Sequence, residues 1–192
     1  MKKKIDHEKL FLRHKDSTLL GPHKFRSVIL LAQKAIEDTS CDTVAEIGVY
    51  NGGVAFALTE IADTVHAFDT FEGMVDVNEK LDGTKLPDGR FKTKPSILQE
   101  LRLHPTIQVF EGTFPGTAID SNYSFVHLDV DTYHGIKESL LYLKNHMISG
   151  GIIVVDDYTF NNTPGCTKAV DELSGTLLPP HIKAGCQALF FF

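Results

Sequence analysis

The stretch that decides the fold runs from Phe125 to Asp157 and reads FVHLDVDTYHGIKESLLYLKNHMISGGIIVVDD. It contains two apolar runs, and each run ends in a pair of acids, Asp129 with Asp131 and Asp156 with Asp157. Between the two runs, apolar residues recur at helical spacing: Ile136, Leu140, Leu143 and Met147. This pattern predicts a strand, a helix and a second strand.

The two acidic pairs are expected to lie together in space. A right-handed crossover makes the two strands parallel, and parallel strands end at the same edge of a sheet, where open α/β sheets bind their ligands. Four carboxylates held that close cannot all stay ionised in a partly buried cleft unless a cation joins them. Oxygen ligands without nearby thiolates favour Mg²⁺, Mn²⁺ or Ca²⁺ over Zn²⁺.

Length and composition narrow the class of protein. The 192 residues predict a single domain over residues 1–192, with 42% hydrophobic and 23% charged residues. A net charge of −6 argues against nucleic acid as a partner. No apolar run is long enough to span a membrane, and the lysine-rich start lacks the apolar region of a signal peptide, so we expect a cytoplasmic protein. The three cysteines suggest neither a disulfide framework nor a zinc cluster.

A second motif is a glycine-rich turn between a strand and a helix. The run TVAEIGVYNGG at residues 43–53 brings Gly48 and Gly52 into this turn, where the backbone bends sharply and comes close to a ligand. Asp69 ends the next predicted strand, 21 residues after Gly48. An acid at this distance is where a cofactor's ribose hydroxyls are held, and we favour that role for Asp69 over a helix cap.

The spacing of the glycines indicates which kind of cofactor the turn accepts. Gly48-x-x-x-Gly52 departs from the Gly-x-Gly-x-x-Gly pattern of dinucleotide sites, which counts against a nicotinamide-dependent oxidoreductase. It fits a cofactor with an amino-acid tail and no phosphates. Glu46 is then placed to face the tail ammonium through water, or is an ordinary acid at the end of a strand.

The remaining segments complete an α/β pattern. Residues 1–20 form a short extension, either a helix over the cleft or a frayed end, and residues 73–94 form a mobile loop near the cleft. A strand ending at Glu111 brings Gly112 and Thr113 beside the adenine of a nucleoside cofactor. The other predicted elements are helices at 25–36, 54–61, 96–103 and 164–173 and a closing strand pair at 182–192. About seven strands alternating with helices predict a three-layer, Rossmann-like α/β domain.

Five motifs in order resemble the macrocin O-methyltransferase family. They are EIGVYNGG at 46–53, FDTFEGM at 68–74, DVDTY at 129–133, GGIIVVDDY at 150–158 and PGCTKAVDE at 164–172. The resemblance covers roughly residues 20–175. It implies a class I methyltransferase fold, whose seven-stranded, mostly parallel sheet has an antiparallel last strand. It also implies Mg²⁺-dependent transfer of a methyl group from S-adenosylmethionine to a sugar hydroxyl.

The same resemblance implies roles for individual residues. It makes Asp129, Asp156 and Asp157 the ligands of Mg²⁺ (or Mn²⁺ or Ca²⁺) and Asp131 the general base; His134 is the rival base, because its ordinary pKa is better placed. We expect S-adenosylmethionine to contact the glycine turn, the ends of the second and third strands, and the first acid of the fourth. These residues are Glu46, Gly48, Tyr50, Asn51, Gly52, Asp69, Thr70, Phe71, Gly112, Thr113 and Asp129.

Departures from the family pattern concern the acceptor. Val130 replaces a glycine that members commonly carry, His134-Gly135 replaces Glu-Ser, and the N-terminal region is short. The acceptor is therefore open: a small-molecule sugar, a similar vicinal diol, or a catechol-type diol. A non-catalytic S-adenosylmethionine-binding protein is a further alternative.

A haloacid-dehalogenase-type phosphatase shares paired aspartates, but too little chain follows Asp157 for its later motifs. The aromatic end at 190–192 indicates either a buried edge or a partner surface, and a homodimer is one form that such a surface would take.

Overall fold

The computed structural model describes residues 5–83 and 87–192; the lysine-rich start at residues 1–4 lies outside them. The strands are β1 (Thr43–Ile47), β2 (Thr64–Asp69), β3 (Ile107–Glu111), β4 (Tyr123–Leu128), β5 (Met147–Val155), β6 (Ile182–Ala184) and β7 (Gln187–Phe191). The helices are α1 (His7–His14), α2 (Pro22–Thr39), α3 (Gly53–Leu58), α4 (Glu79–Asp82), α5 (Pro95–Leu103), α6 (Tyr133–Leu143) and α7 (Pro164–Leu173).

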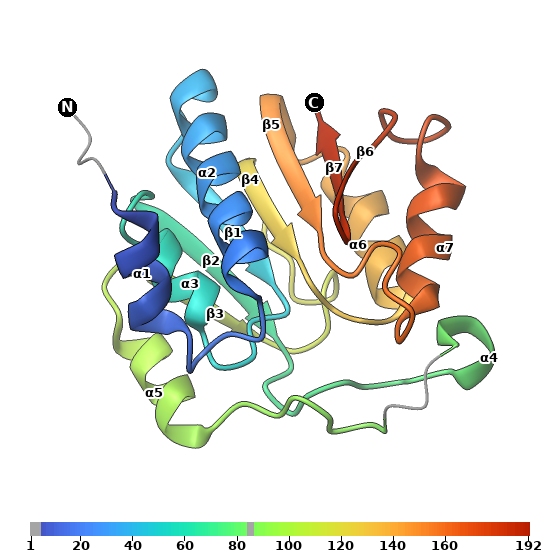
Figure 1. Cartoon of the computed structure of the whole chain (residues 1–192), viewed down its shortest axis with the longest axis horizontal. Coiled ribbons are helices and arrows are strands. Elements are labelled where there is room, and N and C mark those ends of the chain that lie inside the picture. The colour runs from blue at the N-terminus through green and yellow to red at the C-terminus, as the bar shows by residue number, and fades with distance from the viewer. Residues whose placement is uncertain (1–4, 84–86) are drawn as a thin grey trace.

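The strands form one sheet in the order β3-β2-β1-β4-β5-β7-β6 (Figure 1). The five strands from β3 to β5 are parallel, and β7 runs antiparallel to both β5 and β6. The predicted seven-stranded, mostly parallel sheet with an antiparallel last strand is therefore confirmed. The strand order reverses between β1 and β4, and the carboxyl ends of strands at such a reversal form a ligand-binding crevice.

Helices cover both faces of the sheet because the strands are apolar on both sides. Along β5, Ile152 and Val154 face the hydrophobic core that α2 and α3 help to build, whereas Ile153 and Val155 face the core built with α6 and α7. Strand side chains alternate between the two faces, so a continuous apolar run must be buried twice. The result is the predicted three-layer arrangement, visible in Figure 1.

The N-terminal extension contains a helix that packs on the domain. Asp6 caps α1 by accepting a hydrogen bond from the Lys9 backbone N–H (3.1 Å), and Leu10 is fully buried against the core around α2 and α3. The frayed-end alternative is therefore wrong for residues 7–14, because the apolar face of even this short helix packs against α2 and α3.

The predicted end of the central helix is wrong. The helical pattern extended to Met147, but α6 ends at Leu143 and Met147 is the first residue of β5. The backbone carbonyl of His146 accepts a hydrogen bond from the Tyr123 N–H (2.8 Å), and Met147 lies opposite Tyr123 in the sheet. Pairing with β4 thus overrides a spacing that the local sequence shares with a helix.

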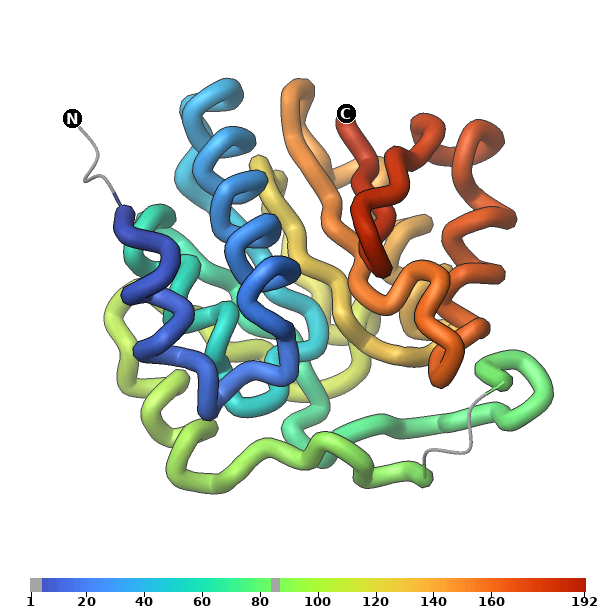
Figure 2. Tube along the Cα trace, in the orientation of Figure 1, coloured from blue at the N-terminus to red at the C-terminus, as the bar shows by residue number. Residues whose placement is uncertain are grey.

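The segment from Thr70 to Lys94, here named the strap, runs below the carboxyl ends of the strands (Figure 2). It contains the short helix α4, which the sequence did not predict; residues 84–86 of the strap lie outside the described part. Asp82 anchors it, because its buried carboxylate accepts hydrogen bonds from the backbone N–H groups of Tyr133 (2.6 Å) and Asn78 (2.7 Å). The strap is thereby attached to the start of α6.

Candidate functional site

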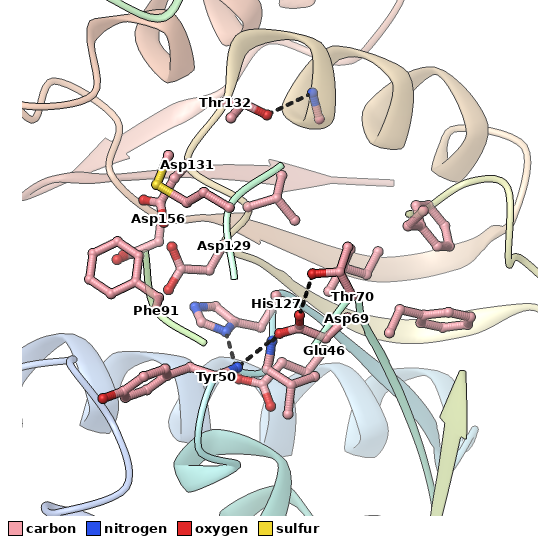
Figure 3. Close-up of a pocket in the computed structure, with 18 of the residues that line it drawn as sticks. Glu46, Tyr50, Asp69, Thr70, Phe91, His127, Asp129, Asp131, Thr132 and Asp156 are labelled. Atoms are coloured by element: carbon pink, nitrogen blue, oxygen red, sulfur yellow. Dashed lines mark hydrogen bonds and ion pairs between the residues drawn. The ribbon is translucent and has the colours of Figure 1, made fainter. Parts of the chain in front are cut away.

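A cavity of about 890 Å³ opens at the carboxyl ends of β1, β2, β4 and β5, at the reversal of the strand order. Figure 3 shows its side chains: Asp129, Asp131 and Asp156 gather on one side, Asp69 and Thr70 lie on another, and His127 and Glu46 lie between. Its size suits a ligand as large as a nucleoside cofactor together with a small acceptor.

The glycine turn lies directly against the end of β4. Gly48 has a φ of +89°, and a Cβ at this position would lie 1.9 Å from the backbone carbonyl oxygen of Asp129. Hydrogen bonds from Gly48 N–H to the Phe68 carbonyl (2.9 Å) and from Asp129 N–H to the Ile47 carbonyl (2.8 Å) continue the sheet on both sides. Only glycine at position 48 lets the glycine turn and the backbone of Asp129 come this close.

Asp69 holds this turn in place. One carboxylate oxygen accepts hydrogen bonds from the N–H groups of Val49 (2.6 Å) and Tyr50 (2.9 Å), and the other accepts from Phe71 N–H (2.7 Å). The sequence analysis linked Asp69 to the glycine turn because both would contact one cofactor. The structure adds that Asp69 and the turn are hydrogen-bonded to each other. Asp69 also lines the cavity, so its ribose role stays a prediction.

The predicted cofactor residues divide into two groups. Those that line the cavity are Glu46, Gly48, Tyr50, Asp69, Thr70, Gly112, Thr113 and Asp129. Asn51, Gly52 and Phe71 are not among the lining residues; the Asn51 side chain is buried and accepts a hydrogen bond from the Lys94 N–H (3.1 Å), which ties the strap to the turn.

The wall of the cavity contains a buried acid–imidazole pair that the sequence analysis missed. Glu46 Oε1 lies 3.5 Å from His127 Nδ1, with side-chain exposures of 3% and 1%. Burial raises the pKa of Glu46, and the nearby imidazole opposes that rise. A signal was present, because His127 precedes Asp129 by two residues on a strand and so points to the same side.

Three of the four predicted acids form a compact cluster. One carboxylate oxygen from each of Asp129, Asp131 and Asp157 lies within 4.8 Å of the others. Burial raises the pKa of Asp129 well above its usual range, and the Asp156 and Asp131 carboxylates add to this rise. Burial and the adjacent Asp157 raise the pKa of Asp131 to about 7. The cluster is therefore an arrangement that a cation would stabilise.

Asp156, the remaining acid, accepts a hydrogen bond at each of its two carboxylate oxygens. Gln187 Nε2 donates to its Oδ1 (2.9 Å) and Lys24 Nζ donates to its Oδ2 (2.8 Å). The predicted metal ligands were Asp129, Asp156 and Asp157, whereas the geometric cluster contains Asp131 in place of Asp156. Asp129 and Asp157 belong to both sets.

The backbone of the cluster adopts rare conformations. Asp131 and Asp157 have φ values of +61° and +59°, and Tyr50 across the cavity has +52°. Residues other than glycine adopt the left-handed region at a cost of about 1–2 kcal/mol, and such residues concentrate at functional sites. Each acid is thereby turned back toward the cavity instead of continuing along its strand.

Two basic side chains complete the site. Lys24, from the first turn of α2, was not predicted as a site residue; burial alone would lower its pKa, but Asp156 and Asp157 outweigh burial and raise it. No local motif marks it, because its partners are more than 130 residues away. His134, the predicted rival base, lines the cavity from the first turn of α6 with an exposed side chain.

The sheet order, the antiparallel β7 and a ligand cavity at the ends of β1 and β4 define a class I methyltransferase fold. The chain belongs to the macrocin O-methyltransferase (TylF) family, whose model matches residues 14–176. The resemblance seen in its five motifs is therefore confirmed.

Individual relatives agree with this assignment. Demethyldecarbamoylnovobiocin O-methyltransferase of Streptomyces niveus is 25% identical over 181 residues, which cover 81% of this chain and 66% of that protein. The chain thus spans about two thirds of the length of this relative. The structure of the O-methyltransferase NovP matches with a TM-score of 0.75 and 20% identity over 91% of this chain and 81% of that one.

A second solved structure is similar over nearly the whole chain. CalS11, a calicheamicin methyltransferase, matches with a TM-score of 0.74 and 16% identity, over 97% of this chain and 91% of that one. At these identities the two structures establish the fold alone. Within the described part of the chain, none of the helices is both long and apolar enough to cross a membrane.

Proposed function

We propose that the protein is an S-adenosylmethionine-dependent O-methyltransferase that uses a divalent cation and methylates a hydroxyl group of a sugar or similar vicinal diol in a small molecule. The observation that carries this proposal is the single cavity that joins the Asp69-held glycine turn to the acidic cluster across β1 and β4. The family, and the O-methyltransferase activity of the Streptomyces niveus relative, support the same reaction.

The glycine turn accounts for binding of the methyl donor. The donor's amino-acid tail would lie against Gly48, with Glu46 below it, and its adenine would lie toward Gly112 and Thr113 at the end of β3. Asp69 lies between these two ends, where a ribose would be. The turn needs no phosphate-binding geometry, because this cofactor has no phosphate.

The acidic cluster accounts for the acceptor side. Clustered carboxylate oxygens are a donor set that fits Mg²⁺ or Mn²⁺, so Asp129 and Asp157, together with Asp131 or Asp156, would hold the ion. When bound, the ion would polarise an acceptor hydroxyl and favour its ionised form. Two neighbouring acceptor oxygens would suit this arrangement, which is why a vicinal diol is proposed.

The chemical step needs orientation and a proton acceptor. The acceptor oxygen attacks the methyl carbon opposite the sulfur; the new C–O bond forms as the C–S bond breaks, and the sulfonium becomes a neutral thioether. The hydroxyl proton would pass to Asp131, which lines the cavity beside the metal ligands, or to His134. The strap would exclude water from the cavity, because Met74 and Phe91 line it.

The proposal is tested in two stages. S-adenosylhomocysteine is titrated calorimetrically into the protein, with NAD⁺ as control; micromolar binding of the first alone is expected, and no binding would contradict the methyl-donor site. Turnover is then followed with vicinal-diol acceptors in Mg²⁺ and in chelator. Asp129→Asn should lower kcat/KM by about two orders of magnitude or more. Asp63→Asn, an exposed acid at the opposite edge of the sheet, should not change it.

A further inference from the structure

Lys24 is the internal cation of the acidic side of the cavity. Its Nζ lies 2.8 Å from Asp156 Oδ2 and 3.1 Å from Asp157 Oδ1, and its side chain is 27% exposed. Its partners are more deeply placed, with side-chain exposures of 3% for Asp156 and 15% for Asp157. An ion pair at this depth is screened far less by water than a surface pair, so its charge acts strongly on its neighbours.

Acidic side chains far outnumber lysines and arginines around the cavity. Among the described residues that line it, Lys24 is the one lysine or arginine. The lining carboxylates number eight: Glu46, Asp69, Asp76, Asp129, Asp131, Glu138, Asp156 and Asp157. Any divalent cation that enters this cavity is therefore attracted by the same acids that already hold Lys24.

We propose that Lys24 is a displaceable counter-ion that competes with the divalent cation and sets its affinity. This inference rests on the metal site of the proposed function. Asp157 belongs both to the acidic cluster and to the Lys24 ion pair, so a cation bound there meets a like charge on the same carboxylate. Asp156 accepts one hydrogen bond at each carboxylate oxygen, one of them from Lys24, so a cation that binds Asp156 also meets the Lys24 charge on that carboxylate.

Lys24 therefore decides between two sets of ligands. With the ammonium in place, the oxygens that lie together are those of Asp129, Asp131 and Asp157. With the ammonium displaced, Asp156 joins Asp129 and Asp157 in the set that the sequence predicted. The Lys24 Nζ already lies over the ring of Phe160, an exposed residue, at 5.9 Å from the ring centroid, so an ammonium that leaves the carboxylates can keep this contact.

The test measures metal affinity, not turnover. Mn²⁺ is titrated calorimetrically into the wild-type protein and into Lys24→Gln, which keeps a hydrogen-bond donor for the carboxylates but removes the charge. Removing a positive charge a few ångströms from a divalent cation should tighten Mn²⁺ binding by about tenfold or more. Lys34→Gln is the matched control, because Lys34 lies on the same helix and pairs with Asp38 (2.7 Å) away from the cavity.

A second variant guards against misfolding. Lys24→Met leaves the two carboxylates without a cation, so the metal-free variant should melt at a lower temperature than the wild type. Saturating Mn²⁺ should raise its melting temperature by more than it raises that of the wild type, because the ion replaces the missing charge. An equal rise in the two proteins would overturn the proposal.

The remaining outcomes separate the two proposals. Mn²⁺ binding by Lys24→Gln but not by the wild type would support the competition in its strongest form. Equal or weaker binding by Lys24→Gln would overturn the role of Lys24 and leave the metal site standing. Absence of Mn²⁺ binding in every variant would overturn both the metal site and this inference, whereas S-adenosylhomocysteine binding would still test the methyl-donor site independently.

Discussion

The contact between Gly48 and Asp129 gives a prediction that the structure allows us to work out in some detail. Gly48→Ala introduces a Cβ 1.9 Å from the Asp129 carbonyl oxygen, at a residue with a φ of +89°. Alanine in the left-handed region costs about 1–2 kcal/mol, and forcing backbone apart in a packed region costs about 1–3 kcal/mol more. We therefore expect the free energy of unfolding to fall by about 2–5 kcal/mol.

A second glycine separates the two contributions. Gly175 also has a positive φ, +70°, but a Cβ there would meet nothing within 4 Å. Gly175→Ala should therefore lose only the backbone contribution, about 1–2 kcal/mol. Urea denaturation of both variants measures the difference, which isolates the cost of the contact with Asp129.

The same pair of variants tests the link to function. Gly48→Ala pushes the glycine turn away from the end of β4, so S-adenosylhomocysteine should bind at least about tenfold more weakly to it, an affinity change of about 1.4 kcal/mol. Gly175→Ala should bind as the wild type does. Equal losses of stability in the two variants, or unchanged binding by Gly48→Ala, would refute the reasoning that close approach of β1 and β4 builds the site.

Three further predictions follow from individual carboxylates. In the folded, metal-free protein the pKa of Asp131 is raised to about 7, whereas in the unfolded chain this carboxyl titrates at about pH 4. Between about pH 4 and 7 the folded protein therefore holds a proton that the unfolded chain has released, so the free energy of unfolding falls as the pH rises through this window. Asp131→Asn should reduce that fall by up to about 4 kcal/mol in urea denaturation, and an unchanged slope would contradict it. Asp69→Ala removes the acceptor of the Val49 and Tyr50 N–H groups, so it should both weaken S-adenosylhomocysteine binding in calorimetry and destabilise the fold by about 1–3 kcal/mol. Asp82→Ala should increase proteolytic cleavage at residues 73–82 without changing Mn²⁺ affinity, because it detaches the strap and not the acidic cluster.

Much of the site was predictable because it follows from local patterns. Apolar runs that end in acids, separated by a helix, must place those acids at one edge of a parallel sheet, since crossover connections are right-handed. The positions of Asp129, Asp131, Asp156 and Asp157 around one cavity agree with this expectation. The nearness of Asp69 to the glycine turn follows for the same reason, because both end adjacent parallel strands.

The parts that were missed depend on contacts between distant segments. Lys24 reaches Asp156 across 132 positions in the chain, and nothing in the sequence around it marks it as a site residue. Met147 fits a helical spacing equally well, and only its pairing opposite Tyr123 makes it the start of a strand. The direction of a long side chain, and the choice between two local conformations of similar free energy, are set by packing partners that a single sequence does not identify.

The sequence alone determined the order of helices and strands along most of the chain and the four acids at the carboxyl edge, because periodicity is a local property and crossover connections are right-handed. Its five motifs determined the family. The tertiary structure alone decided how those acids are used. It brings Asp129, Asp131 and Asp157 into one cluster, and it places Lys24 and Gln187 where they donate hydrogen bonds to Asp156. The physical reason is that buried charges must be neutralised by whatever partner the fold brings within reach, and only the folded chain determines which partner that is.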